Sequence, residues 1–96
     1  MIVLAYGGVN IRKIREGLQL YHCEIIHTCS ANFVLEKLCE NHSNINSVIV
    51  RKGMAFERTI RGVIEEEKLG VLYYIYDPET DKLIPKGGLK VSAGTQ

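Results

Sequence analysis

The sequence predicts a three-layer α/β domain, with a mainly parallel sheet of strand order 2-1-3-4 and an antiparallel C-terminal edge strand. Short apolar runs alternate with amphipathic segments of about 10–15 residues, which is typical of strands and helices joined by right-handed crossovers. Hydrophobic residues make up 46% and charged residues 24% of the chain, a globular balance. The 96 residues therefore fit a single α/β domain at residues 1–90, followed by a frayed C-terminal tail at 91–96.

The chain begins with a strand and a helix. Residues 2–6 form a continuous apolar run that Gly7-Gly8 ends, which indicates a strand buried on both faces. Asn10 is a good N-cap, because its side chain can accept a hydrogen bond from the first turn of a helix. The apolar positions of that helix recur at three- and four-residue steps: Ile11, Ile14, Leu18 and Tyr21.

The next two units repeat this alternation. Residues 23–29 are rich in branched side chains and predict the second strand, and Ser30 is expected to cap a helix over residues 31–41. A third apolar run within residues 44–51 predicts the third strand, and a third helix is expected over residues 54–68. The inward face of this helix is expected to hold Phe56, Ile60, Val63 and Ile64.

The last segment predicts a hairpin. Residues 71–76 form an apolar run dense in tyrosine, which indicates a fourth strand. Residues 77–81 predict a turn, because their proline fixes φ and their acidic side chains bond locally. Residues 83–84 start a short returning strand, which Pro85 restricts to the edge of the sheet.

Ligands of open parallel sheets bind beyond the carboxyl ends of the strands, where the strand order reverses. Two glycines there would let a ligand approach the backbone, and two basic side chains would favour an anion such as a phosphate. The alternative is that the glycines only make a tight turn and the basic residues end a strand in solvent. The residues of this candidate anion site, called the rim below, are Gly7, Gly8, Asn10, Ser30, Arg51 and Lys52.

Three cysteines and three histidines lie close in the sequence: His22, Cys23, His27, Cys29, Cys39 and His42. Cys23 and Cys29 lie about 20 Å apart along one strand, too far to share a metal ion. A set of His22, Cys23, Cys39 and His42 is conceivable, but we expect reduced thiols, no bound zinc and no cofactor. Cys29 and His27 could form a nucleophile and base pair, but the sequence offers no third group to orient the histidine. We therefore assign no catalytic residues.

Charge gives little support for nucleic-acid or membrane binding. The net charge is +1, and no half of the chain is a basic arm. Basic residues do occur on the first and third helices: Arg12, Lys13, Arg58 and Arg61. The aromatic side chain nearest to them, Phe56, is expected to face inward, where no base could stack on it. Nucleic-acid binding is therefore the third alternative.

The order of elements resembles that of response-regulator receiver domains, which have five βα units in a flavodoxin-like order. Receivers place an acidic pair after strand one, where this chain has Gly7-Gly8, and a phosphoacceptor Asp at the end of strand three, where it has Arg51-Lys52. The Thr or Ser that follows strand four in receivers is replaced by Asp77, and a hairpin stands in place of the final unit. The resemblance covers the chain up to Tyr76. It implies a degenerate, non-phosphorylated module used for binding.

We therefore expect a non-enzymatic module in regulation or assembly that acts through protein–protein contacts. The alternative is a small protein or enzyme that binds a phosphate or nucleotide ligand at the rim. The N-terminal apolar run lacks a basic flank and is too short for a signal peptide or a membrane span. A cytoplasmic protein is the expectation.

A homodimer is also expected, because three helices cannot cover both faces of such a sheet. The fourth strand is apolar at every position, and no helix follows it to cover the face that the first helix shares. An exposed apolar and tyrosine surface favours association. The predicted interface residues are Tyr73, Tyr74 and Tyr76. The alternative is that residues 83–91 fold over this surface.

Overall fold

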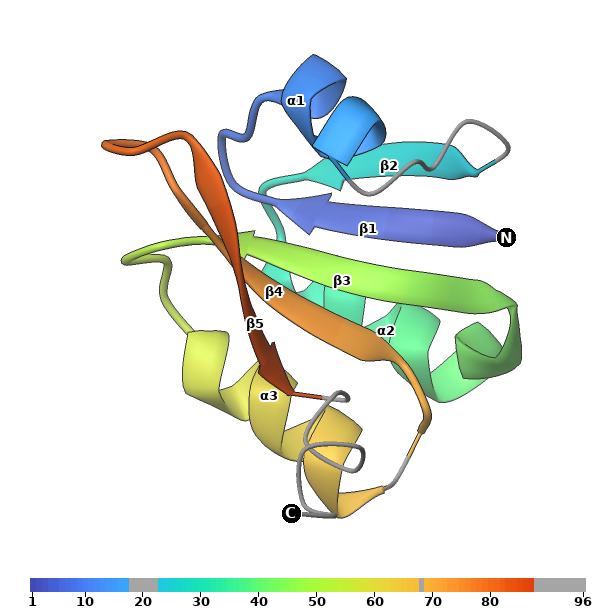
Figure 1. Cartoon of the computed structure of the whole chain (residues 1–96). Coiled ribbons are helices and arrows are strands. Elements are labelled where there is room, and N and C mark those ends of the chain that lie inside the picture. The colour runs from blue at the N-terminus through green and yellow to red at the C-terminus, as the bar shows by residue number, and fades with distance from the viewer. Residues whose placement is uncertain (18–22, 68, 88–96) are drawn as a thin grey trace, which may run out of the picture.

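The structure, a computed structural model, describes residues 1–17, 23–67 and 69–87 (Figure 1). The elements are β1 (Ile2–Tyr6), α1 (Ile11–Gly17), β2 (Glu24–Thr28), α2 (Ala31–Asn41), the 3-10 turn η1 (His42–Asn44), β3 (Ile45–Arg51), α3 (Glu57–Glu66), β4 (Leu72–Asp77) and β5 (Lys82–Gly87). The strands form one sheet of order β2-β1-β3-β4-β5. Strands β1 to β4 pair in parallel and β5 pairs antiparallel to β4, so the predicted fold class is confirmed.

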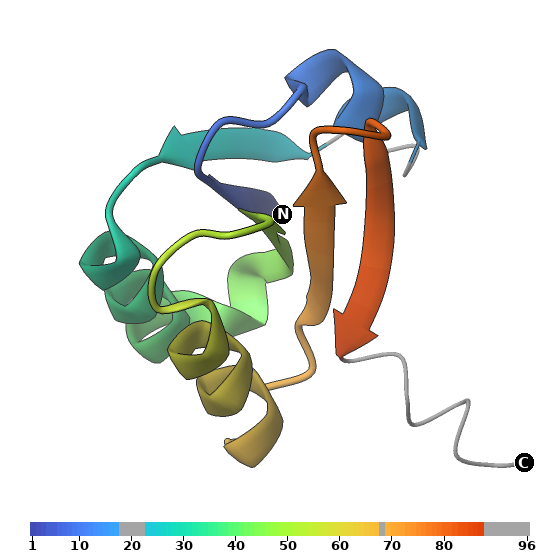
Figure 2. The same ribbon diagram turned by 90° about the vertical axis from the view of Figure 1, so that its left-hand side faces the viewer.

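The helices divide between the two faces of the sheet (Figures 1 and 2). On one face, α2 and α3 bury Val34 and Ile60 against Leu4 and Val48. On the other face, Ile14 of α1 packs in a smaller cluster with strand residues. Strand β1 lies between these layers and is buried on both, as its continuous apolar run predicts.

Both predicted N-caps are present. The Asn10 side chain accepts a hydrogen bond from the Lys13 amide at 3.1 Å, and the Ser30 hydroxyl accepts one from the Phe33 amide at 3.2 Å. Each satisfies an amide that the first turn of its helix leaves without a partner. Leu18, Tyr21 and the tail at 91–96 lie outside the described residues.

The third helix begins later than its apolar spacing suggests. It starts at Glu57, and Phe56 takes a left-handed backbone with φ 66°. The expectation that Phe56 faces inward is wrong, because its side chain is 63% exposed. Residues four apart share a face only within a helix, and the backbone at Phe56 is not helical.

The tyrosines of β4 are buried, so the expectation of an exposed tyrosine surface is wrong. Tyr73 is 0% exposed, Tyr76 6% and Tyr74 9%. Tyr74 and Tyr76 share a cluster with Ile49, against which Leu83 of β5 packs. Leu83 of the returning strand thus packs on part of the face that lacks a helix. Residues 88–91, which the alternative interpretation also includes, lie outside the described residues.

Ser47 of β3 has a fully buried hydroxyl with no hydrogen-bond partner among the described residues. A buried donor without a partner loses its hydration and gains nothing in return. Ser47→Ala is therefore expected to raise the free energy of unfolding by about 1 kcal/mol. Urea denaturation measures this change. A destabilised alanine variant would show that the hydroxyl has a partner in solution.

Candidate functional site

The rim forms a tight junction at the carboxyl ends of β1 and β3. Gly7 has a φ of 94°, and a Cβ atom placed on it would lie 2.9 Å from the Arg51 Cβ and 3.0 Å from the Met54 Sδ. A Cβ on Gly8 would lie 3.0 Å from an Arg51 guanidinium nitrogen. The space that the two glycines leave is therefore occupied by side chains of the chain itself.

Other polar groups of the rim also have partners within the fold. The side chains of Asn10 and Ser30 cap helices, and the carbonyl oxygen of Gly7 hydrogen-bonds to the His27 Nε2 atom. The Lys52 ammonium lies 3.9 Å from a carboxylate oxygen of Asp77. The structure brings Gly7, Gly8 and Arg51 together, but this arrangement favours the tight-turn interpretation.

The loop between β3 and α3 is held to the sheet at two points. The Lys52 amide donates to the Tyr76 carbonyl at 2.8 Å, and the Tyr6 hydroxyl donates to the Ala55 carbonyl at 3.0 Å. Gly53 turns the loop with a φ of 90°. These contacts fix the backbone that carries Lys52 and the exposed Phe56.

The cysteine and histidine cluster is dispersed over the fold. Cys23 packs on the α1 side of the sheet, whereas Cys39 and His42 share a hollow with Leu38 and Leu69. All three cysteines carry free thiols. His22 lies outside the described residues, and within those residues no group of three His, Cys, Asp or Glu side chains could hold a metal ion.

Tyr73 belongs to a buried polar network on the α3 side. Its hydroxyl donates to the Glu57 carboxylate at 2.9 Å, and the Arg61 Nε atom lies 3.7 Å from that carboxylate. Burial, followed by the hydrogen bond to Glu57, raises the pKa of Tyr73 well above its usual value. Its neutral hydroxyl therefore acts as a fixed donor.

The other two predicted interface tyrosines lie on the opposite face. Burial raises the pKa of Tyr74. The Tyr76 hydroxyl donates to the Asp81 carboxylate at 2.5 Å, and this hydrogen bond raises the pKa of Tyr76. Tyr73 and Tyr74 thus cannot contribute to one contact surface, since they point to opposite sides of β4.

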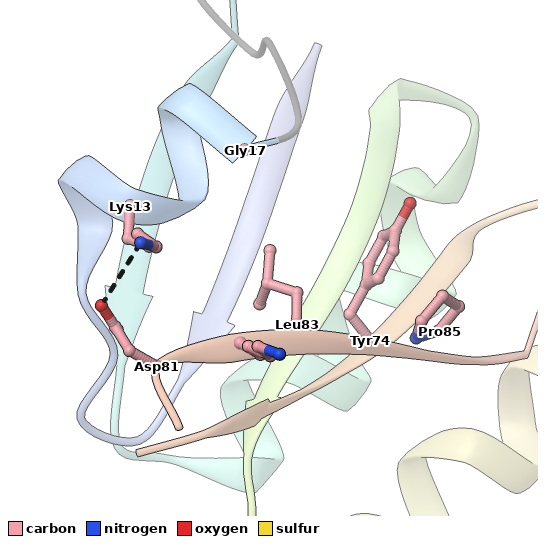
Figure 3. A pocket seen from close by; sticks show the side chains of 7 residues that line it. Lys13, Gly17, Tyr74, Asp81, Leu83 and Pro85 are labelled. Carbon is pink, nitrogen blue, oxygen red and sulfur yellow. Dashed lines mark ion pairs between the residues drawn. The ribbon is translucent and has the colours of Figure 1, made fainter. Parts of the chain in front are cut away.

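An apolar groove lies between α1 and β5 on the face that carries Tyr74 (Figure 3). Its volume is about 360 Å³. The Tyr74 ring, Leu83 and Pro85 supply its apolar surface, and the ion pair between Lys13 and Asp81, 3.9 Å long, lies at one end. The residues of this hairpin groove are Lys13, Gly17, Tyr74, Asp81, Lys82, Leu83 and Pro85. The sequence predicted the uncovered face, but of these residues it predicted only Tyr74 as a contact residue.

A second hollow, of about 350 Å³, lies on the other side of the hairpin, where α3 packs beside β5. It is rich in basic side chains that come from a loop, a helix and a strand. The residues of this basic hollow are Lys52, Gly53, Glu57, Arg58, Arg61, Ile75, Ile84 and Lys86. No sequence spacing indicates it, because these residues meet only after the hairpin folds back.

The four basic residues named for nucleic-acid binding do not form one surface. Arg12 and Lys13 lie on α1, and Arg58 and Arg61 lie on α3, which covers the opposite face of the sheet. Among the described residues, no helix is long and apolar enough to cross a membrane.

Comparisons with protein-family models, with curated proteins and with solved structures found no match to this chain.

Proposed function

We propose that this protein is a non-enzymatic, receiver-like binding module that acts through protein–protein contacts and associates with a second copy of itself. The observation that carries the proposal is the hairpin groove, which exposes apolar surface beside Tyr74 where the topology provides no helix. Apolar surface that a fold leaves open on one face is a common contact site. A two-fold dimer is the commonest way to cover it.

The free edge of β5 supports contact through the face of the sheet rather than through its edge. Lys82 and Lys86 are exposed on this strand, and Pro85 lacks an amide donor. Charged residues and proline oppose the pairing of edge strands between molecules. A second copy is therefore expected to approach over the hairpin groove, with Leu83 at the contact.

The rim, by contrast, gives weaker support to the alternative of a phosphate or nucleotide ligand at Gly7 and Gly8. Arg51 and Met54 fill the space beside these glycines. Asn10 and Ser30 are used as helix caps. Regulation or assembly in the cytoplasm remains the setting that we propose for the module.

Self-association is tested by sedimentation velocity across micromolar concentrations. Leu83→Asp is expected to weaken a wild-type dimer by about 10–100-fold, because a charge replaces a half-buried leucine that a second copy would cover. Ile84→Asp is the matched control, since Ile84 lies on the other face of β5, in the basic hollow. A wild-type monomer at every concentration, or equal effects of the two variants, would contradict the proposal.

A further inference from the structure

Four cations converge on the basic hollow from three parts of the chain. Lys52 comes from the loop after β3, Arg58 and Arg61 from α3, and Lys86 from β5. The hydrogen bond from the Lys52 amide to β4 holds the loop in place. Positive charges gathered in this way repel one another unless an anion lies between them.

Carboxylates within the fold compensate only part of this charge. Glu57 is the one acidic residue among the described residues that line the hollow, and its carboxylate already accepts the Tyr73 hydroxyl and pairs with Arg61. Lys52 lies 3.9 Å from Asp77 and keeps 62% of its side chain exposed. Arg58 and Lys86 form no ion pair with a described residue. The hollow therefore has uncompensated positive charge.

The apolar part of the hollow strengthens its attraction for an anion. Ile75 and Ile84 line it together with the basic side chains. Apolar surface beside charged groups lowers the local dielectric constant once a ligand covers it, which strengthens the ionic contacts with that ligand. A volume of about 350 Å³ lies at the small end of the range for ligand sites and suits a compact polyanionic group.

We propose that the basic hollow binds the phosphate groups of a small phosphorylated ligand. Arginine guanidinium groups recognise phosphate oxygens by paired hydrogen bonds, and lysines add point charges. The convergence of the cations on one hollow favours a small ligand over a nucleic-acid strand, which would need a basic stripe along the surface. This site differs from the rim in all its residues except Lys52 and does not depend on self-association.

Calorimetric titration with sodium pyrophosphate tests the site on the whole chain. The wild type is expected to bind saturably with one site per chain. Arg58→Gln and Lys86→Gln are each expected to weaken binding by about 10-fold, because each removes a charge-assisted hydrogen bond. Both side chains are exposed, and circular dichroism checks that the variants stay folded.

Arg12→Gln is the matched control, since Arg12 is an exposed arginine on the opposite face of the sheet. It is expected to leave pyrophosphate affinity unchanged. A parallel titration with single-stranded oligothymidylate separates a small ligand from a nucleic-acid strand. Absence of saturable pyrophosphate binding, an equal loss in Arg12→Gln, or binding of the oligonucleotide alone would overturn the proposal.

Discussion

Gly7→Ala is expected to lower the free energy of unfolding by about 2–4 kcal/mol, the sum of backbone strain and overpacking. The φ of Gly7 is 94°, a value that an L side chain adopts only under strain. The new Cβ would also lie 2.9 Å from the Arg51 Cβ, which sits too close to the backbone of β3 to move aside. Met54 is more flexible and can give way. Urea denaturation of both proteins measures the difference.

Gly62→Ala is the control for this experiment. Gly62 lies within α3, and a Cβ on it would meet nothing within 4 Å. Alanine there is expected to raise stability by about 0.8–1 kcal/mol, because alanine has the higher helix propensity. Unchanged stability of Gly7→Ala would contradict both the positive φ of Gly7 and its close contact with Arg51. That result would mean that the space beside Gly7 is open in solution and would favour the rim as a binding site.

Local signals in the sequence were sufficient to predict the sheet. The apolar run of β1 and the N-caps Asn10 and Ser30 depend only on neighbouring residues. Pro85 indicated an edge strand because proline has no amide hydrogen to donate to a neighbouring strand, whatever the rest of the sheet is. Strand order then followed from short right-handed crossovers.

The surfaces of the molecule could not be predicted in the same way. The exposure of Phe56 depends on one left-handed residue, which shifts the start of α3 and breaks the expected periodicity. The burial of Tyr74 depends on how the β4–β5 hairpin brings Leu83 against it. The alternation of side chains along β4 does not determine this packing. The basic hollow joins residues that are far apart in the sequence, such as Lys52 and Lys86, so no local sequence pattern predicts it.

Tyr73 is expected to make the fold sensitive to alkaline pH. Burial and then the hydrogen bond to Glu57 raise the pKa of Tyr73, whereas a tyrosine in the unfolded chain ionises near pH 10. Above that pH the unfolded state loses this proton first, so the stabilisation is complete below about pH 10 and is lost as the pH rises further. The loss is expected to reach about 2 kcal/mol by pH 11.5, since one proton changes stability by about 1.4 kcal/mol per pH unit.

Tyr73→Phe isolates this contribution from that of other groups. At pH 7 the variant is expected to be less stable by about 1–2 kcal/mol, because the hydroxyl no longer donates to the Glu57 carboxylate. The stability curves of variant and wild type should converge as the pH rises above about 10, where only the wild type loses this contribution. Glu57→Gln should keep most of the alkaline slope, because burial is the larger cause of the raised pKa of Tyr73. Urea denaturation at a series of pH values measures all three proteins, and parallel curves for wild type and Tyr73→Phe would show that Tyr73 ionises as readily in the folded chain as in the unfolded one.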